Sequence, residues 1–155
     1  MRHYLVVANQ TLGQPQLIEK VQECMAEGPC RFFLLVPATH ARDHIRFSPA
    51  EAYAIAQRRL DAAVAGLQRL GADVRGEVGD PSPIVAIGEV LRHRDFDELI
   101  LSTLPPGPSQ WLRRGVPEGI ERIFHIPVTL VVAPAEVPAS ALVPEHASAP
   151  LEVAT

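Results

Sequence analysis

The chain has 155 residues, of which 47% are apolar and 21% charged, and its formal net charge at pH 7 is -4. A chain of this length forms one domain that buries about two-thirds of its unfolded surface, so it needs no disulfide or metal to fold. The acidic balance, without a large basic stripe, argues against nucleic acid as a partner. The first apolar run, residues 4–8, is too short for a membrane span or a signal peptide, and we expect a cytoplasmic protein with no membrane partner.

The two cysteines, Cys24 and Cys30, are too few for a disulfide framework in a chain with an ample apolar core. Cys24 falls within a helical pattern and Cys30 lies just before a strand pattern. No CxxC spacing indicates zinc. We interpret both residues as small buried or half-buried thiols.

The first part of the chain alternates between strand-like and helix-like patterns. Residues 4–8 are a continuous apolar run, which is typical of a strand buried on both faces. Residues 14–27 repeat apolar side chains at helical spacing, and Gly28-Pro29 then ends the predicted helix. Residues 32–36 form a second continuous apolar run, which predicts a second buried strand.

A long helix is predicted after an irregular polar stretch. Ser48 can cap this helix, Pro49 fits its first position, and Glu51 completes a capping box. Gly71 ends it, and residues 72–78 predict a weaker third strand. The apolar positions expected on one face of the helix are Tyr53, Ala56, Leu60, Ala63, Val64, Leu67 and Leu70.

The alternation continues in the second half. Asp80 is expected to cap the next helix, with Pro81 at its first position. The inward face of that helix is expected to carry Ile84, Ile87, Gly88 and Leu91. Residues 97–102 and 128–133 predict the fourth and fifth strands, with a helix over residues 117–124 between them.

Five strands that alternate with helices predict parallel pairing, right-handed crossovers and helices on both faces of one sheet. We expect this α/β domain to span residues 1–133. Residues 134–155 contain four prolines, much alanine and no apolar period, which predicts an extended or disordered tail. In an alternative interpretation, the apolar residues of the tail pack on a partner subunit; these are Val137, Leu142, Val143, Leu151 and Val153.

The order and spacing of four segments resemble the universal stress protein family. These segments are residues 4–9, 79–81, 97–100 and 126–132, and the likeness extends over about residues 2–133. The resemblance implies a flavodoxin-like (adenine nucleotide alpha hydrolase-like) three-layer sandwich, with a five-stranded parallel sheet of order 3-2-1-4-5. Ligands of such sheets bind outside the carboxyl ends of strands 1 and 4, where the strand order reverses.

The resemblance places candidate ligand-binding residues around one crevice at this switch point. They are Asn9, Thr39, His40, Gly79, Ser102, Thr103, Gly107, Arg113, Arg114 and Gly115. Asn9 stands where the family usually has an aspartate, and its amide can still hydrogen-bond a ligand amide or hydroxyl. Ser109 supplies a further hydroxyl in the same loop.

The phosphate loop that the family implies is degenerate in this chain. ATP-binding members resemble G-x2-G-x9-G-[ST] after the fourth strand, where glycines let backbone N–H groups curl around phosphates. One of the four corresponding positions matches; the residues there are Ser102, Pro105, Gly115 and Val116. Three prolines between positions 105 and 108 have no N–H to donate, and Glu118 and Glu121 place negative charge near the next helix start. These departures predict that conventional ATP binding is lost.

Two functions stay open. The first is a regulatory or binding domain of the stress response without conventional ATP binding. The alternative is an adenine-nucleotide-binding protein that takes ATP or AMP through a non-standard loop, because Arg113 and Arg114 can hold an anion bidentately. Those arginines could equally be solvated or pair with Glu118. No nucleophile-and-base pair indicates an enzyme, although weak ATP hydrolysis is left open.

Three further features of the sequence bear on metals, ligands and partners. His40 and His44 have the i, i+4 spacing of a metal pair on a helix, but no third ligand is evident beyond Asp43, and we expect no metal. Trp111 is interpreted as a lid on the crevice, as a contact for another protein, or as local packing of the loop. The resemblance also implies a homodimer through the exposed fifth strand.

Overall fold

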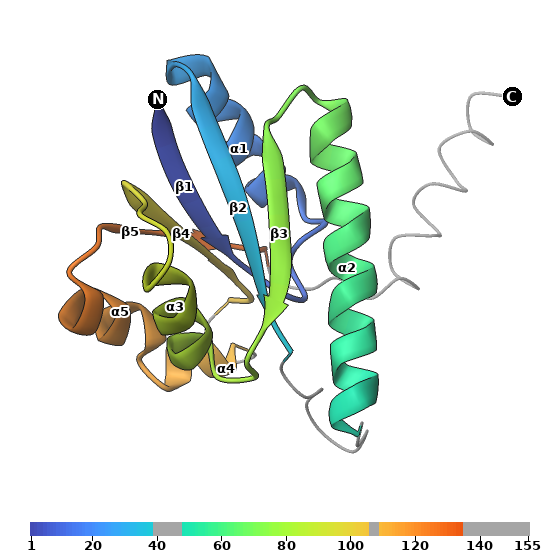
Figure 1. Ribbon diagram of the computed structural model, residues 1–155, viewed down its shortest axis with the longest axis vertical. Helices are drawn as coiled ribbons and strands as arrows, with labels where there is room; N and C mark the ends of the chain where they lie inside the picture. Colours follow the sequence, from blue (N-terminus) through green and yellow to red (C-terminus); the bar gives the residue numbers. More distant parts are fainter. Residues whose placement is uncertain (39–47, 106–108, 135–155) are drawn as a thin grey trace, which may run out of the picture.

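The computed structural model describes residues 1–38, 48–105 and 109–134 of the chain (Figure 1). In chain order its elements are β1 (Arg2–Val7), α1 (Pro15–Glu27), β2 (Cys30–Pro37), α2 (Pro49–Arg69), β3 (Val74–Gly79), α3 (Pro83–Leu91), β4 (Glu98–Thr103), α4 (Gln110–Arg113), α5 (Val116–Phe124) and β5 (Val128–Val132). Every strand and long helix expected from the sequence is present, with ends that shift by one or a few residues. The short helix α4 was not predicted. The expected tail lies almost entirely outside the described residues.

The strands form one sheet of order β3-β2-β1-β4-β5, and every neighbouring pair is parallel (Figure 1). The chain moves outward from β1 to β3 and then crosses back to β4 and β5, so the strand order reverses between β1 and β4. The flavodoxin-like α/β fold with a 3-2-1-4-5 sheet is therefore confirmed.

The central strand β1 divides the core into two layers. Successive side chains of a strand point to opposite faces. Tyr4 and Val6 pack in the layer that contains α1 and α2, whereas Leu5 and Val7 pack in the layer that contains α3 and α5. None of these four side chains is more than 1% exposed. The continuous apolar run in the sequence thus reflects a strand covered on both faces.

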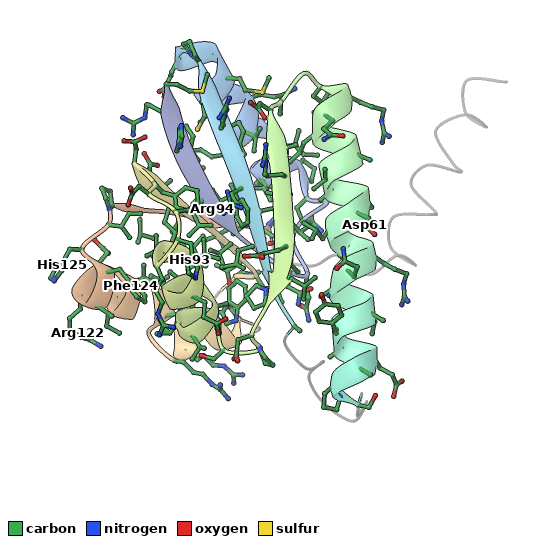
Figure 2. The ribbon with its side chains drawn as sticks, viewed as in Figure 1. Asp61, His93, Arg94, Arg122, Phe124 and His125 are labelled. Carbon is green, nitrogen blue, oxygen red and sulfur yellow. The ribbon has the colours of Figure 1, made fainter. Side chains whose placement is uncertain are left out.

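Helix α3 and helix α5 cover the same face of the sheet and contact each other. Phe124 points from α5 toward α3 (Figure 2), and a Cβ placed on Gly88 would lie 3.5 Å from its ring. Gly88 therefore faces inward, as expected, and keeps the two helices close. Ile123, one residue earlier, is 50% exposed.

The helix starts follow local chemistry, and the start of α3 differs from the expectation. The capping box of α2 is confirmed, because Ser48 Oγ accepts from the Glu51 amide and the Glu51 carboxylate accepts from the Ser48 amide. At α3 the prediction was wrong. Ser82, not Asp80, is the N-cap residue, and its Oγ accepts from the Val85 amide; Pro83, not Pro81, occupies the first helical position. Asp80 instead accepts from the Ser82 amide at 2.8 Å, which orders the turn before the helix.

Two residues expected on the inner face of α2 are exposed. Tyr53 is 52% exposed and Leu70 is 45% exposed. Both lie near the ends of the helix, Tyr53 in its first turns and Leu70 at its C-cap. Periodicity assigns a residue to a helix face, but burial also requires a partner beneath that turn.

The two thiols lie as expected. Cys24 is buried on α1, Cys30 is half-buried at the start of β2, and both are free. Among the described residues, no helix combines the length and apolar character that crossing a bilayer requires.

Candidate functional site

The carboxyl ends of β1 and β4 lie side by side, because these strands pair in parallel from Tyr4↔Glu98 to Val7↔Leu101. Asn9 follows β1, and Ser102 and Thr103 end β4. In open α/β sheets this reversal of strand order is where ligands bind. The fold therefore brings Asn9 close to Ser102 and Thr103, which lie more than ninety positions later in the sequence.

Both the nitrogen and the oxygen of the Asn9 side-chain amide form hydrogen bonds. It is 5% exposed, and its Nδ2 donates to the carbonyl oxygen of Pro37 at the end of β2, at 2.8 Å. Its Oδ1 accepts from Nη1 of Arg59 in α2, at 2.5 Å. The acceptor oxygen of Asn9 is thus directed at a protein cation.

Arg59 was not singled out from the sequence. The pKa of its guanidinium is lowered, first by burial and then by the neighbouring charge of Arg58. Within the described residues no carboxylate lies at ion-pair distance from Arg59. Arg59 lies about three turns into α2, the helix that follows β2. Nothing in the sequence indicated that its side chain would reach the end of β1.

The hydroxyls at the end of β4 bond to other side chains of the chain. Ser102 Oγ lies 2.6 Å from Thr11 Oγ1, and Thr103 Oγ1 lies 2.5 Å from Ser109 Oγ. All four of these residues are at most 4% exposed. Thr11 was also missed; its only signal was a polar residue in the turn just after a strand.

Ser109 organises the loop that leads to α4. Its Oγ accepts from the Leu112 amide at 3.1 Å, and its own amide donates to the carbonyl oxygen of Pro105 at 3.0 Å. Gly115 then adopts the left-handed conformation, with φ of 68°, and serves as the N-cap of α5. This left-handed turn explains a glycine at that position without a ligand.

Several solved structures resemble this architecture, and two of them are universal stress protein family structures. A protein from the universal stress protein family of Burkholderia pseudomallei matches with a TM-score of 0.58 at 15% sequence identity, over 83% of this chain and 94% of that chain. A universal stress protein family protein from Arabidopsis thaliana with AMP bound matches with a TM-score of 0.54 at 18% identity, over 90% of this chain and 97% of that chain. The chain has the universal stress protein fold.

At these identities the likeness establishes the fold alone. No protein-family model matches the sequence, and no curated protein matches it significantly. What the universal stress protein fold does in this chain therefore depends on its own residues at the switch point.

Gly79, at the end of β3, is explained by packing. A Cβ there would lie 2.9 Å from both Ala86 Cβ of α3 and Leu35 Cδ1 of β2. Its carbonyl oxygen accepts from the Ala38 amide at 3.0 Å. Within the universal stress protein fold of this chain, Gly79 thus lets α3 approach the sheet.

Arg113 and Arg114 lie at the end of α4 and just after it, and both are exposed. Neither guanidinium bonds to a described residue, so pairing with Glu118, one of the alternatives left open, is not seen there. Trp111, on the same helix, is half-buried and packs against the layer of α3 and α5. Of the three interpretations of Trp111, the structure supports local packing.

The remaining candidates lie outside the described residues. They are Thr39, His40 and Gly107, together with His44 and Asp43 of the metal alternative. In the part of the chain that the structure describes, no three His, Cys, Asp or Glu side chains gather closely enough to hold a metal ion.

Proposed function

We propose that this chain is a universal-stress-protein-like regulatory domain that binds a partner or a small anionic ligand without the ATP-binding loop of its family. The observation that carries the proposal is the pairing of the buried hydroxyls of Ser102 with Thr11 and of Thr103 with Ser109. Each pair uses one of its two hydroxyl hydrogens internally, and Thr103 Oγ1 also donates to the Leu104 carbonyl oxygen, so fewer hydroxyl donors remain for a triphosphate in this place.

The backbone of the loop supports the same conclusion. The amides of Ser109 and Gly115 donate to the carbonyl oxygens of Pro105 and Leu112, respectively. Pro117, in the first turn of α5, has no N–H and is buried. Several of the described amides in this segment are thus absent or engaged, whereas a phosphate site at a helix start depends on free ones.

The test is a thermal-shift and calorimetric titration of the full chain with ATP, AMP and inorganic phosphate at millimolar concentration. We expect the melting temperature to stay constant with ATP and AMP. A saturable stabilisation by ATP would overturn the proposal, because any ligand that binds only the folded state raises its stability.

A second candidate function is adenine-nucleotide binding by a different grip. The Arabidopsis thaliana structure of this fold has AMP bound, and Arg113 and Arg114 are exposed cations next to the loop. If AMP binds, the double variant Arg113→Ala/Arg114→Ala should weaken it about tenfold or more. Arg122→Ala is the matched control, since Arg122 is an exposed arginine on α5 (Figure 2).

The same proposal includes a homodimer through β5. This strand is one edge of the sheet, and its central residue Leu130 is 42% exposed. Exposed apolar edge strands are sites of pairing with another chain. Leu130→Arg should lower the molar mass in sedimentation experiments, and an unchanged mass in a dimeric wild type would place the interface elsewhere.

A further inference from the structure

The opposite edge of the sheet is formed by β3, whose only strand neighbour among the described residues is β2. The carbonyl oxygens of Asp73 and Gly79 accept from the Phe32 and Ala38 amides at the β2 side. Because backbone groups of alternate strand residues point to opposite sides, Val74, Gly76 and Val78 direct theirs outward. An outward row of donors and acceptors is a template for another strand.

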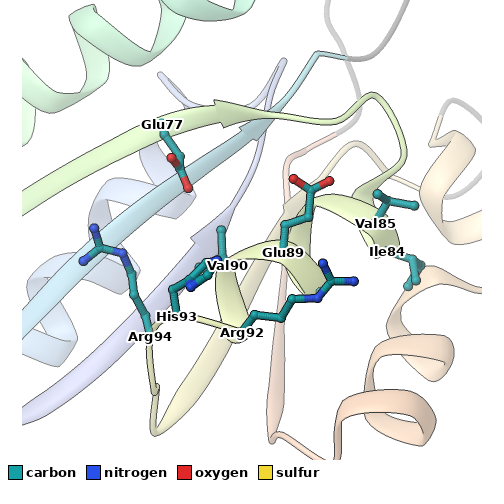
Figure 3. Close-up of a pocket in the computed structure, with 9 residues that line it drawn as sticks. Glu77, Ile84, Val85, Glu89, Val90, Arg92, His93 and Arg94 are labelled. Atoms are coloured by element: carbon teal, nitrogen blue, oxygen red, sulfur yellow. The ribbon is translucent and has the colours of Figure 1, made fainter.

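The side chains of β3 alternate in the same way. Val74 and Val78 pack in the layer of α1 and α2. Arg75 and Glu77 point to the other face, where they border two open grooves of about 290 and 720 Å³. Figure 3 shows Glu77 directed into the larger groove, between β3 and α3. No described residue forms an ion pair with either Arg75 or Glu77.

The charges of β3 are complementary to those of a second β3 that runs in the opposite direction. Val-Arg-Gly-Glu-Val, residues 74–78, places Arg75 opposite Glu77 of a second copy when two strands pair antiparallel about Gly76. The same register places Val74 opposite Val78. Opposite charges that face each other across antiparallel strands attract, and like charges repel.

The backbone directions agree with this register. Val74, Gly76 and Val78 point outward, so they would form the hydrogen-bonded pairs, about six bonds in total once the Val74 carbonyl oxygen exchanges its bond from Gln68 Nε2 for one from the partner strand. Arg75 and Glu77 then fall in the non-hydrogen-bonded pairs, where side chains lie closest. A two-fold axis at Gly76 therefore satisfies the backbone and both charged pairs at once.

Helix α2 flanks this edge and would lie next to the α2 of a second copy. Gln68 Nε2 donates to the outward carbonyl oxygen of Val74 at 3.3 Å, which identifies the side of α2 that flanks this edge. Ala65 and Ala54 share that side by helical spacing. Asp61 lies between them and accepts from Gln57 Nε2 at 2.9 Å. Ala54 and Ala65 are small and exposed, so they would add little bulk between two neighbouring α2 helices.

We infer that β3 is a self-association edge, at which a second copy of this chain adds its own β3 antiparallel and pairs Arg75 with Glu77 of the partner. This contact is independent of β5, which lies at the far edge of the sheet. The two edges together would build assemblies larger than a dimer.

The test is a charge exchange, read by sedimentation velocity over a concentration series of the full chain. Arg75→Glu and Glu77→Arg each turn both symmetric pairs repulsive, so each should weaken association about tenfold or more. The double variant Arg75→Glu/Glu77→Arg should restore it. An equimolar mixture of the two single variants should also associate, because each then supplies the charge that the other lacks.

All variants are compared in a Leu130→Arg background, which removes the proposed β5 contact. Association that persists there and follows the charge exchange supports the β3 edge. Loss of all association in that background, or single variants that associate as the parent does, would overturn it while leaving the β5 proposal intact. Far-UV circular dichroism should be the same for every variant, since Arg75 and Glu77 are exposed.

Discussion

Arg59 of α2 donates to the side chain of Asn9, fifty positions earlier, with 2.5 Å between Nη1 and Oδ1. The Asn9 amide also donates to Pro37 O, so this side chain ties the ends of β1 and β2 to α2. The contact brings the guanidinium of Arg59 next to Oδ1 of Asn9 at the switch point of the sheet.

Removal of this contact should lower stability measurably. Arg59→Ala is expected to lower the free energy of unfolding by about 1–2 kcal/mol, because Oδ1 of the buried Asn9 loses a charged donor. Arg58→Ala is the matched control on the same helix and should change it by less than about 0.5 kcal/mol. Equal effects of the two substitutions in urea unfolding would show that the bond to Asn9 contributes nothing.

The paired hydroxyls should behave as a coupled unit. Ser102→Ala leaves the hydroxyl of Thr11 buried without its partner, at an expected loss of about 1–3 kcal/mol. Thr11→Val should cost a similar amount, whereas the double variant should cost clearly less than the sum. A double-mutant cycle by chemical denaturation measures this coupling, and simple additivity would contradict the bond.

Alanine substitutions at three glycines should change stability differently: two should lower it and one should raise it. A Cβ on Gly76 would lie 2.3 Å from the backbone oxygen of Leu34, so Gly76→Ala should destabilise by about 2 kcal/mol or more. Gly79→Ala should cost about 1–3 kcal/mol because its Cβ would lie 2.9 Å from Ala86 and Leu35. Gly66→Ala in α2 meets nothing closer than 3.8 Å.

Gly66→Ala should therefore raise the free energy of unfolding by about 0.5–1 kcal/mol, since alanine favours the helix over the unfolded chain. Thermal unfolding of the three variants side by side makes the comparison. A Gly79→Ala variant as stable as the parent would reopen a ligand-related role for that glycine.

The buried thiol of Cys24 should make stability fall in alkaline solution. Burial raises the pKa of Cys24 above its ordinary value, so the thiol stays protonated in the folded chain while it ionises in the unfolded chain. Its contribution is complete below about pH 9 and is lost as pH rises toward the higher folded pKa.

The measurement is the free energy of unfolding in urea at pH 8, 9 and 10, under reducing conditions. Cys24→Ala should show a shallower fall with pH than the wild type, although Tyr4 and Cys30, whose pKa values are also raised by burial, keep part of the slope. Identical slopes would mean that the thiol does not contribute.

The sequence by itself determined the elements and their sequence order. Apolar runs identified buried strands such as β1, and Ser48 with Glu51 identified the start of α2, because these signals act within a few residues. The family resemblance added the sheet order. The prolines after β4 also indicated a loop poor in amide donors, since proline lacks an N–H wherever it lies.

Only the tertiary structure decided which distant side chains meet. Arg59 reaches Asn9, and Thr11 reaches Ser102, because parallel strands and the helices on them bring residues together that no periodicity relates. The cap of α3 depended on which of two nearby polar residues had the right backbone geometry, and that residue was Ser82. Exposure of Tyr53 likewise depended on what lies beneath its turn of α2, which is a property of packing and not of the helix itself.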